Sequence, residues 1–210
     1  IIVFNSEKVR AQHFKLGYKR SCSYILHNTI DLEKFAPSKL NFKKKLAKEI
    51  DISSKKIFIG CVSRFHPNKG IFDLLRGFAF LKNKKNNFHL ILAGYKLSKE
   101  NKKLVFYAKR LGIYENISLL GPSDRISTFL KSIDIFISPS KTESFPNALL
   151  EAMASGLLCI ATDTGDSNHI ISSLGILIPP GFKPFQLVDA INESSKKIPL
   201  SISFKNKAHN

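Results

Sequence analysis

The sequence contains no apolar run that approaches the ~18 residues needed by a membrane-spanning helix. Residues 1–4 (IIVF) are too short for the apolar core of a signal peptide, and no small-residue cleavage site follows them. Internal repeats and low-complexity tracts are also absent. With 43% apolar residues over 210 positions, the composition is that of a globular protein with a full core. Because residue 1 is not Met, we expect the chain to begin inside a longer protein.

Cysteine is scarce, which excludes a disulfide scaffold. The chain has three cysteines, an odd number, and they lie far apart at Cys22, Cys61 and Cys159. The last two lie inside apolar runs. We therefore predict buried, reduced thiols and a cytoplasmic protein. No pair of Cys or His residues has metal-ligand spacing, so no metal site is predicted.

Acidic residues are also few: 16 Asp and Glu stand against 33 Lys and Arg, for a net charge of +17. Such a charge suits nucleic acid or an anionic membrane. However, only six of the 33 basic residues are Arg, and the lysines are scattered in pairs and triplets. Specific nucleic-acid recognition relies on Arg forks. The pattern favours a solvated surface, with weak attraction to an anionic membrane as the alternative and no nucleic acid as partner.

Apolar segments typical of strands alternate with amphipathic segments typical of helices along most of the chain. Strands are predicted over 56–62, 88–93, 117–120, 134–138, 157–161 and 175–178, and helices over 70–81, 98–111, about 123–132, 147–155 and 184–195. Strands apolar on both faces indicate an α/β fold with a parallel sheet covered by helices on both sides. Ligands bind beyond the carboxyl ends of such strands. A site is therefore expected in the loops after Val62, Gly94, Leu120, Ser138 and Ala161.

The two ends of the chain differ from this pattern. Residues 1–38 hold a short strand, a helix over 6–16 and a second strand over 23–26. Residues 198–210 are polar and patternless, so we expect them to be frayed or a truncated tail.

Three loops carry residues suited to binding. In the loop 63–70, Arg64 and Lys69 are predicted to converge on an anion beside a helix N-terminus, or else to be ordinary surface cations. In the loop 138–147 and the helix after it, Glu143 and Glu151 suit paired sugar or ribose hydroxyls. The alternatives are a helix-flanking acid for Glu143 and a solvated residue for Glu151. The small, Gly-containing loop 161–167 is a further binding loop or a plain strand-to-helix turn.

Taken together, these segments resemble a known family. The segment 143–156 (ESFPNALLEAMASG), with Glu143 and Glu151 eight positions apart, resembles the signature of the retaining glycosyltransferases of group 1, family 4. So do the segment 157–166 (LLCIATDTGD), the diphosphate-loop-like SRFHPNKG at 63–70, and the hinge-like NTID at 28–31. The motifs stand in the family's order and cover most of the chain, so their combination is specific.

The resemblance implies a Rossmann-like domain that forms the C-terminal, sugar-donor-binding half of a GT-B fold of two domains. Residues 1–30 would be a remnant of the N-terminal domain with the hinge, residues 31–197 the domain that binds the nucleotide sugar, and residues 198–210 the tail. Two positions depart from the family pattern: Thr29 stands where Gly is usual in the hinge, and His169 where Glu is usual.

The resemblance also assigns roles to charged residues. Glu151 would bind the ribose hydroxyls of the nucleotide. Glu143 would be the catalytic residue that contacts the donor sugar near the reacting carbon, either orienting the sugar or stabilising an oxocarbenium-like state. Arg64 and Lys69 would neutralise the diphosphate. Fixed cations and a helix N-terminus stabilise the charge that builds on a leaving diphosphate, so the resemblance implies transfer without metal or other cofactor.

Uncharged positions complete the implied site. Phe145, Asn147 and Ala148 would lie over sugar and phosphate, and Gly121 and Pro122 would lie beside the nucleobase. The implied reaction is glycosyl transfer, with retention, from a nucleotide-diphosphate sugar to a glycan or lipid-linked acceptor in polysaccharide or lipopolysaccharide synthesis. Its setting would be the cytoplasmic face of the inner membrane. The alternative is a non-catalytic or split-subunit nucleotide-sugar-binding domain, whose N-terminal domain is supplied in cis or in trans.

Overall fold

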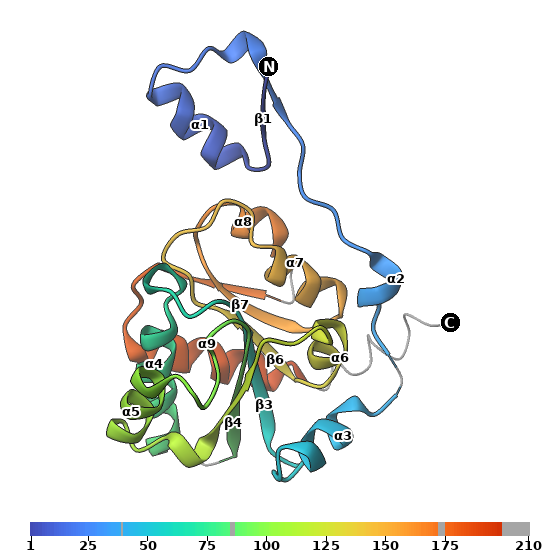
Figure 1. Cartoon of the computed structure of the whole chain (residues 1–210), viewed down its shortest axis with the longest axis vertical. Helices are drawn as coiled ribbons and strands as arrows, with labels where there is room; N and C mark the ends of the chain where they lie inside the picture. Colours follow the sequence, from blue (N-terminus) through green and yellow to red (C-terminus); the bar gives the residue numbers. More distant parts are fainter. Residues whose placement is uncertain (39, 85–86, 172–174, 199–210) are drawn as a thin grey trace.

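A computed structural model describes residues 1–38, 40–84, 87–171 and 175–198 (Figure 1). The main body is a six-stranded sheet in the order β5-β4-β3-β6-β7-β8, and all of its neighbouring strands pair in parallel. Its strands are β3 Ile57–Val62, β4 Phe88–Ala93, β5 Ile117–Gly121, β6 Ile135–Ser138, β7 Leu158–Thr162 and β8 Gly175–Ile178. We call residues 42–198 the sheet domain.

Helices cover both faces of this sheet. The helices α4 Ile71–Lys84, α5 Lys102–Arg110 and α9 Pro184–Lys196 pack on one core layer, and α3 Phe42–Glu49, α6 Ile126–Lys131 and α7 Asn147–Ala154 pack on the other. Every residue of β4 is buried, which explains why this strand is apolar on both faces. The predicted α/β class, a Rossmann-like parallel sheet with helices on both faces, is confirmed.

The order of the strands determines where loops can form a site. The chain enters the sheet at its centre, in β3, builds outwards through β4 and β5, and returns to pair β6 with β3. Connections on the two sides of this switch point leave in opposite directions, so a crevice forms at the carboxyl ends of β3 and β6. The loops that border this crevice are 63–70 and 139–146.

A small unit of residues 1–26 lies at one end of the molecule, outside the six-stranded sheet, and we call it the N-terminal unit (Figure 1). It contains β1 Ile2–Phe4, α1 Glu7–Lys15, the 3-10 turn Arg20–Cys22 and β2 Ser23–Ile25, with β1 and β2 paired in parallel. A linker then leads through the short α2 Leu32–Phe35 to α3. The predicted strand, helix and strand of this region are confirmed.

Some predicted elements need correction. Residues 98–101 were predicted to be helical, but α5 begins at Lys102 because the Asn101 side chain accepts a hydrogen bond from the Leu104 N–H, while Ser98 bridges to Leu120. The helices α2, α3 and the short α8 Ser167–Ile170 were not predicted. The proposed domain boundaries stay predictions. Of the tail expected to be frayed, Ile198 packs against the core and residues 199–210 lie outside the described residues.

The cysteines behave as predicted at two of three positions. Cys61 and Cys159 are fully buried free thiols, whereas Cys22 is an exposed free thiol. Burial raises the pKa of Cys61 to about 12, and Lys69 opposes this weakly. Among the described residues, no helix is both long and apolar enough to cross a membrane.

Candidate functional site

A cleft of about 410 Å³ opens at the switch point, over the carboxyl ends of β3, β4 and β6. Six of the nine residues predicted for the site line it: Arg64, Lys69, Glu143, Phe145, Asn147 and Ala148. The other lining residues are Val62, Ser63, Gly94, Tyr95, Ser138, Pro139, Ser140 and Pro146. Three loops that are far apart in the sequence therefore form one concave surface, as expected for a parallel sheet.

An ion pair between Lys69 and Glu143 lies in this cleft. The Lys69 Nζ is 2.5 Å from Glu143 Oε1, and the Ser140 hydroxyl donates to the same oxygen at 2.7 Å. The two charged side chains are only 20% and 16% exposed, so solvent screens their attraction less than it would at a surface. Arg64 is exposed, and its guanidinium has no ion pair or hydrogen bond within the described chain. The expected pair of cations is thus one neutralised lysine and one free arginine.

The backbone explains why Lys69 reaches Glu143. Gly70 follows a 3-10 turn (Pro67–Lys69) with a φ of 64°, and a Cβ there would lie 1.9 Å from the carbonyl oxygen of Pro139. Only glycine allows the loops after β3 and β6 to approach this closely. The Lys141 N–H donates to the Asn68 carbonyl at 2.7 Å and joins the same two loops. His66 accepts from the Asn68 N–H, a local role in the loop.

Two further side chains support the acid, and the sequence analysis did not single them out. The Thr162 hydroxyl donates to the carbonyl of Ser140 at 2.5 Å and lies 3.3 Å from that of Ser138. Ser140, which is 3% exposed, in turn holds Glu143. Both residues lie in loops that were flagged, but a serine or threonine in a polar loop carries no signal of which carboxylate it will meet. Tyr95, in the loop after β4, also lines the cleft and was not singled out.

The N-terminus of α7 forms one wall of the cleft. Pro146 precedes the helix without a side-chain cap, and its carbonyl accepts from the N–H groups of Leu149 and Leu150. The first N–H groups of a helix, here those of Asn147 and Ala148, have no acceptor within the helix. With the helix dipole, they make this end of α7 partially positive. An anion would therefore meet Arg64 on one side and these amides on the other.

Glu151, Gly121 and Pro122 do not line the cleft. Glu151 is half-buried one turn along α7, where burial raises its pKa and Lys34 opposes this. Its carboxylate makes no hydrogen bond or salt bridge within the residues described. Gly121 accepts from the Gly94 N–H at 2.7 Å, which ties the turn after β5 to a cleft loop, and Pro122 is exposed beside it.

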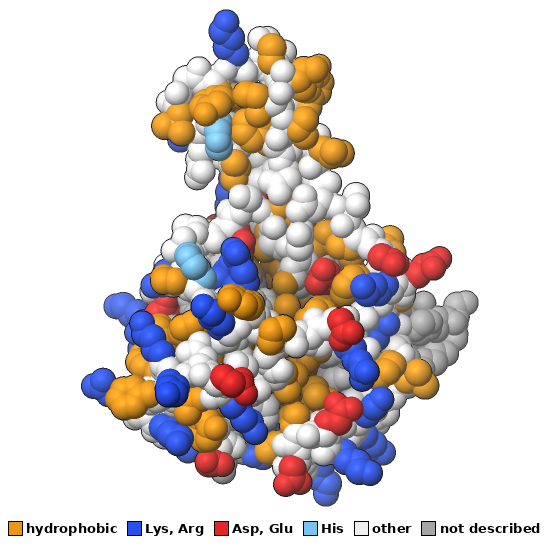
Figure 2. Space-filling model, viewed as in Figure 1, with side chains coloured by type: hydrophobic (Ala, Val, Ile, Leu, Met, Phe, Trp, Pro, Cys, Tyr) orange, Lys and Arg blue, Asp and Glu red, His pale blue; other side chains and the backbone are white. Residues whose placement is uncertain are grey.

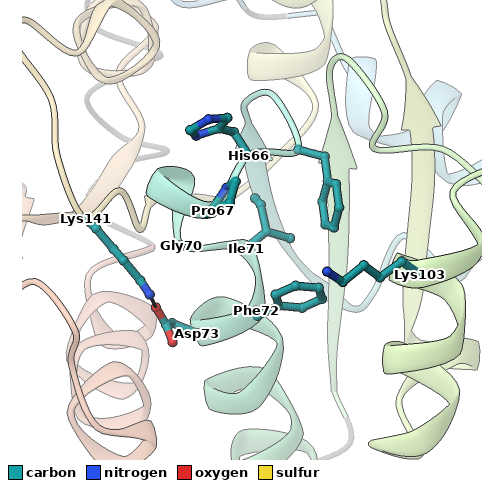
Figure 3. A pocket seen from close by; sticks show the side chains of 9 residues that line it. His66, Pro67, Gly70, Ile71, Phe72, Asp73, Lys103 and Lys141 are labelled. Carbon is teal, nitrogen blue, oxygen red and sulfur yellow. Dashed lines mark ion pairs between the residues drawn. The ribbon is translucent and has the colours of Figure 1, made fainter.

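A second cavity, of about 350 Å³, lies behind the loop 65–70 between α4 and α5 (Figure 3). The rings of Phe65 and Phe72 pack edge to face with centroids 5.5 Å apart, and none of the predicted site residues lines it. Asp73, which is 6% exposed, pairs with Lys141 at 3.4 Å (Figure 3). This pair holds the loop after β6 against α4. No cluster of three or more His, Cys, Asp or Glu placed to hold a metal ion occurs among the described residues.

The chain that forms this cleft matches a known protein family. The family model of "Glycosyl transferases group 1" matches residues 42–210, well over half of the chain. The chain belongs to this family. Membership in group 1, expected from the motifs at 63–70 and 143–166, is therefore confirmed. Members of this family are glycosyl transferases.

Curated relatives agree with the family. The putative glycosyltransferase EpsF of Bacillus subtilis (strain 168) is 35% identical over 164 residues, covering 76% of this chain and 40% of EpsF. The lipopolysaccharide core biosynthesis mannosyltransferase LpsB of Rhizobium meliloti (strain 1021) is 28% identical over 152 residues, covering 70% of this chain and 42% of LpsB. This group 1 chain thus spans about two fifths of the length of the curated relatives it matches.

Solved structures share the fold. Anabaena HepE, crystallised with UDP and glucose, superposes with a TM-score of 0.86 at 22% identity, covering 99% of this chain and 56% of HepE. WaaG, a glycosyltransferase involved in lipopolysaccharide biosynthesis, superposes with a TM-score of 0.82 at 21% identity, covering 98% of this chain and 56% of WaaG. The coverage includes the N-terminal unit as well as the sheet domain.

Proposed function

We propose that this chain is the sugar-donor-binding half of a retaining, metal-independent glycosyltransferase of family 4. It would transfer a hexose from a nucleotide-diphosphate sugar to a glycan or lipid-linked acceptor in cell-surface polysaccharide or lipopolysaccharide synthesis. The observation that carries the proposal is the convergence of Arg64, Lys69, Glu143 and the α7 N-terminus on one cleft at the switch point. The relatives named for lipopolysaccharide synthesis, and HepE with its bound UDP, support it.

The charges in the cleft suit departure of a diphosphate. Breaking the bond between sugar and phosphate leaves negative charge on the phosphate oxygens. Arg64, Lys69 and the amides of Asn147 and Ala148 would stabilise that charge, the role that a metal ion fills in other transferases. Because these groups are in place before the reaction, they need little reorganisation when the charge develops.

Glu143 would contact the donor sugar. Lys69 and Ser140 both bind its Oε1, so Oε2 is the oxygen left to accept from a sugar hydroxyl. Glu151 would bind the two ribose hydroxyls, because its carboxylate is half-buried and makes no hydrogen bond to the described chain. Phe145 would lie over the sugar, and the turn at Gly121 and Pro122 would lie beside the base.

Calorimetric titration with UDP, GDP and ADP, without added metal and in the presence of EDTA, tests the donor half. We expect saturable binding of one nucleotide that falls at least tenfold in Glu151→Ala and in Lys69→Ala, since each removes a charge-assisted contact. Glu193→Ala is the matched control, because Glu193 is an exposed acid paired only with Lys197. Equal affinity in all four proteins would contradict the assigned site, and binding only after magnesium is added would contradict metal independence.

A non-catalytic or split-subunit nucleotide-sugar-binding domain is the second candidate. It is favoured by apolar side chains exposed on the N-terminal unit, among them Ile1, Val3 and Leu26 (Figure 2). In both readings an N-terminal domain in cis or in trans would complete the acceptor site. Transfer assays with and without that domain separate the two. The anomeric proton of the product in an NMR spectrum reports retention or inversion.

We further propose a cytoplasmic location, with peripheral association at the inner membrane through the charge of +17. Figure 2 shows basic side chains scattered over the visible face with acidic ones between them, and no single basic patch dominates it. Such dispersed charge predicts weak, salt-sensitive binding. Flotation with vesicles of phosphatidylglycerol should recover the protein at 50 mM salt and lose it at 300 mM. Vesicles of phosphatidylcholine should recover none, and salt-independent flotation would contradict the proposal.

A further inference from the structure

A buried carboxylate connects the two parts of the molecule. Asp166, in the turn between β7 and α8, accepts from the Ser6 hydroxyl at 2.9 Å, from the Glu7 N–H at 3.1 Å and from the Lys8 N–H at 3.4 Å. Asp166 and Ser6 are both fully buried. The partners lie about 160 positions apart in the sequence, on opposite sides of the junction between the N-terminal unit and the sheet domain.

These bonds complete the N-terminus of α1. A helix leaves its first four N–H groups without intrahelical partners beyond the N-cap carbonyl. Here these are the N–H groups of Ser6, Glu7, Lys8 and Val9. The Val9 N–H donates to the Ser6 hydroxyl oxygen, and Asp166 accepts from those of Glu7 and Lys8. The Arg10 N–H makes the first regular helical bond, to the Ser6 carbonyl. Two N–H groups of the α1 N-terminus therefore find their acceptor in the sheet domain. The positive end of the α1 dipole adds to the attraction for the carboxylate.

The backbone of Asp166 contacts the loop that carries Glu143 into the cleft. Its backbone N–H donates to the Ser144 carbonyl at 3.1 Å. A Cβ on the preceding Gly165 would lie 2.2 Å from that carbonyl oxygen and 2.6 Å from the carbonyl oxygen of Glu143. The turn thus packs directly on the peptide that carries the Lys69–Glu143 pair. A continuous path of contacts runs from α1 through Asp166 and Ser144 to Glu143.

We propose that Asp166 is a positioning residue that holds the N-terminal unit in a fixed orientation on the sheet domain. Only its consequence for transfer rests on the proposed function, because the docking itself depends on contacts within this chain. Other contacts among the described residues at the junction are the Lys8–Asp163 ion pair and, from the linker, the hydrogen bond from Asn28 to Asn147 and the ring contact of His27 with Phe145. The Lys8–Asp163 pair is 40% and 49% exposed, and such pairs contribute little.

Distances between two spin labels test the docking in the full chain. One label is placed on the natural Cys22, which is exposed in the N-terminal unit, and the other on a Lys102→Cys substitution at the exposed start of α5. We expect one narrow distance distribution in the parent protein and a broad one in Asp166→Ala. Asp163→Ala is the matched control, since it removes a carboxylate three positions away that pairs with the exposed Lys8 side chain and accepts from none of the α1 backbone N–H groups. It should leave the distribution narrow.

Hydrogen exchange of single amides provides the second readout. In Asp166→Ala the amides of Glu7 and Lys8 should exchange about tenfold faster or more, the effect of losing a helix cap. Asp166→Asn should restore part of the protection, because an amide oxygen still caps a helix. If circular dichroism shows that Asp166→Ala does not fold, the same measurements are made on Ser6→Ala. This variant removes the hydroxyl that donates to Asp166 without altering the sheet domain.

Two results would overturn the proposal: unchanged distances in Asp166→Ala and Ser6→Ala, or equal broadening in Asp166→Ala and Asp163→Ala. Both measurements are made without nucleotide. Failure of UDP to bind would therefore count against the proposed function and leave the docking result standing.

Discussion

Acidification should destabilise this protein through one buried histidine, His89 on β4. Its side chain is 1% exposed, and burial, with a smaller contribution from Lys56, lowers its pKa from 6.5 to about 4. The ring Nε2 lies 2.9 Å from the Ser118 hydroxyl, and Nδ1 has no hydrogen-bond partner among the described residues. The fold therefore accommodates the neutral ring and offers nothing to stabilise its charged form.

The size of the effect follows from the two pKa values. The unfolded chain takes up the proton near pH 6.5, whereas the folded protein takes it up only near pH 4. Between these values the unfolded state binds more protons, so stability falls as the pH falls. For one group, the free energy of unfolding decreases by about 1 kcal/mol between pH 7 and 5.5. The loss reaches about 3 kcal/mol once the pH is below both values.

Urea unfolding followed by circular dichroism at pH 7 and 5.5 measures this loss. The matched variant is His89→Gln, which cannot be charged and keeps an amide to bond with Ser118. Because carboxylates and other histidines titrate in both proteins, the difference between their two pH dependences isolates His89. We expect the parent protein to lose about 1 kcal/mol more than the variant over this range. Identical pH dependences, or a greater loss in the variant, would refute the reasoning.

Two further predictions concern the backbone and the thiols. Gly70→Ala should lower the free energy of unfolding by about 2 kcal/mol or more, because φ is 64° and the new Cβ meets Pro139. Gly112→Ala, with φ of 66° and no atom within 4 Å, should cost about 1 kcal/mol, and equal losses in urea melts would contradict the contact with Pro139. Iodoacetamide should modify Cys22 in the native protein and spare Cys61 and Cys159, which are fully buried. Mass spectrometry after native and denaturing treatment checks this, and rapid native modification of Cys61 would contradict its burial.

The strands were predictable because burial on both faces of the sheet requires apolar residues at consecutive positions of the sequence. Every residue of β4 is apolar or, at His89, buried with a hydrogen bond. The helix α3 is harder to predict from the sequence, since three consecutive lysines follow its first residue and only Leu46 and Ala47 are buried. The start of α5 was placed four residues early because Ser98 bridges to Leu120 on β5 and Asn101 caps the helix, which keeps residues 98–101 out of it. Local pattern does not reveal such a tertiary preference.

For the candidate site, the sequence located residues but not their partners. Motif order identified Arg64, Lys69 and Glu143, and the structure places all three in one cleft. That Lys69 is already paired with Glu143 depends on the close approach at Gly70, which joins loops about 70 positions apart. The docking contact of Asp166 was equally invisible, because nothing in a polar turn indicates which helix end it will meet. The distances between loops depend on the whole sheet, so no single segment of the sequence predicts them.

The contact between Asp166 and α1 also has a consequence for how the chain is made. On the ribosome, the carboxylate that accepts from the start of α1 is synthesised about 160 residues after Ser6. The half-sheet β3-β4-β5 can assemble meanwhile, because its strands are neighbours in the chain. The N-terminal unit, however, stays undocked until β7 and the turn after it have left the exit tunnel. A nascent chain stalled before residue 166 would carry a formed half-sheet and a loose N-terminal unit, so the two parts of the molecule acquire their mutual orientation only after β7 is made.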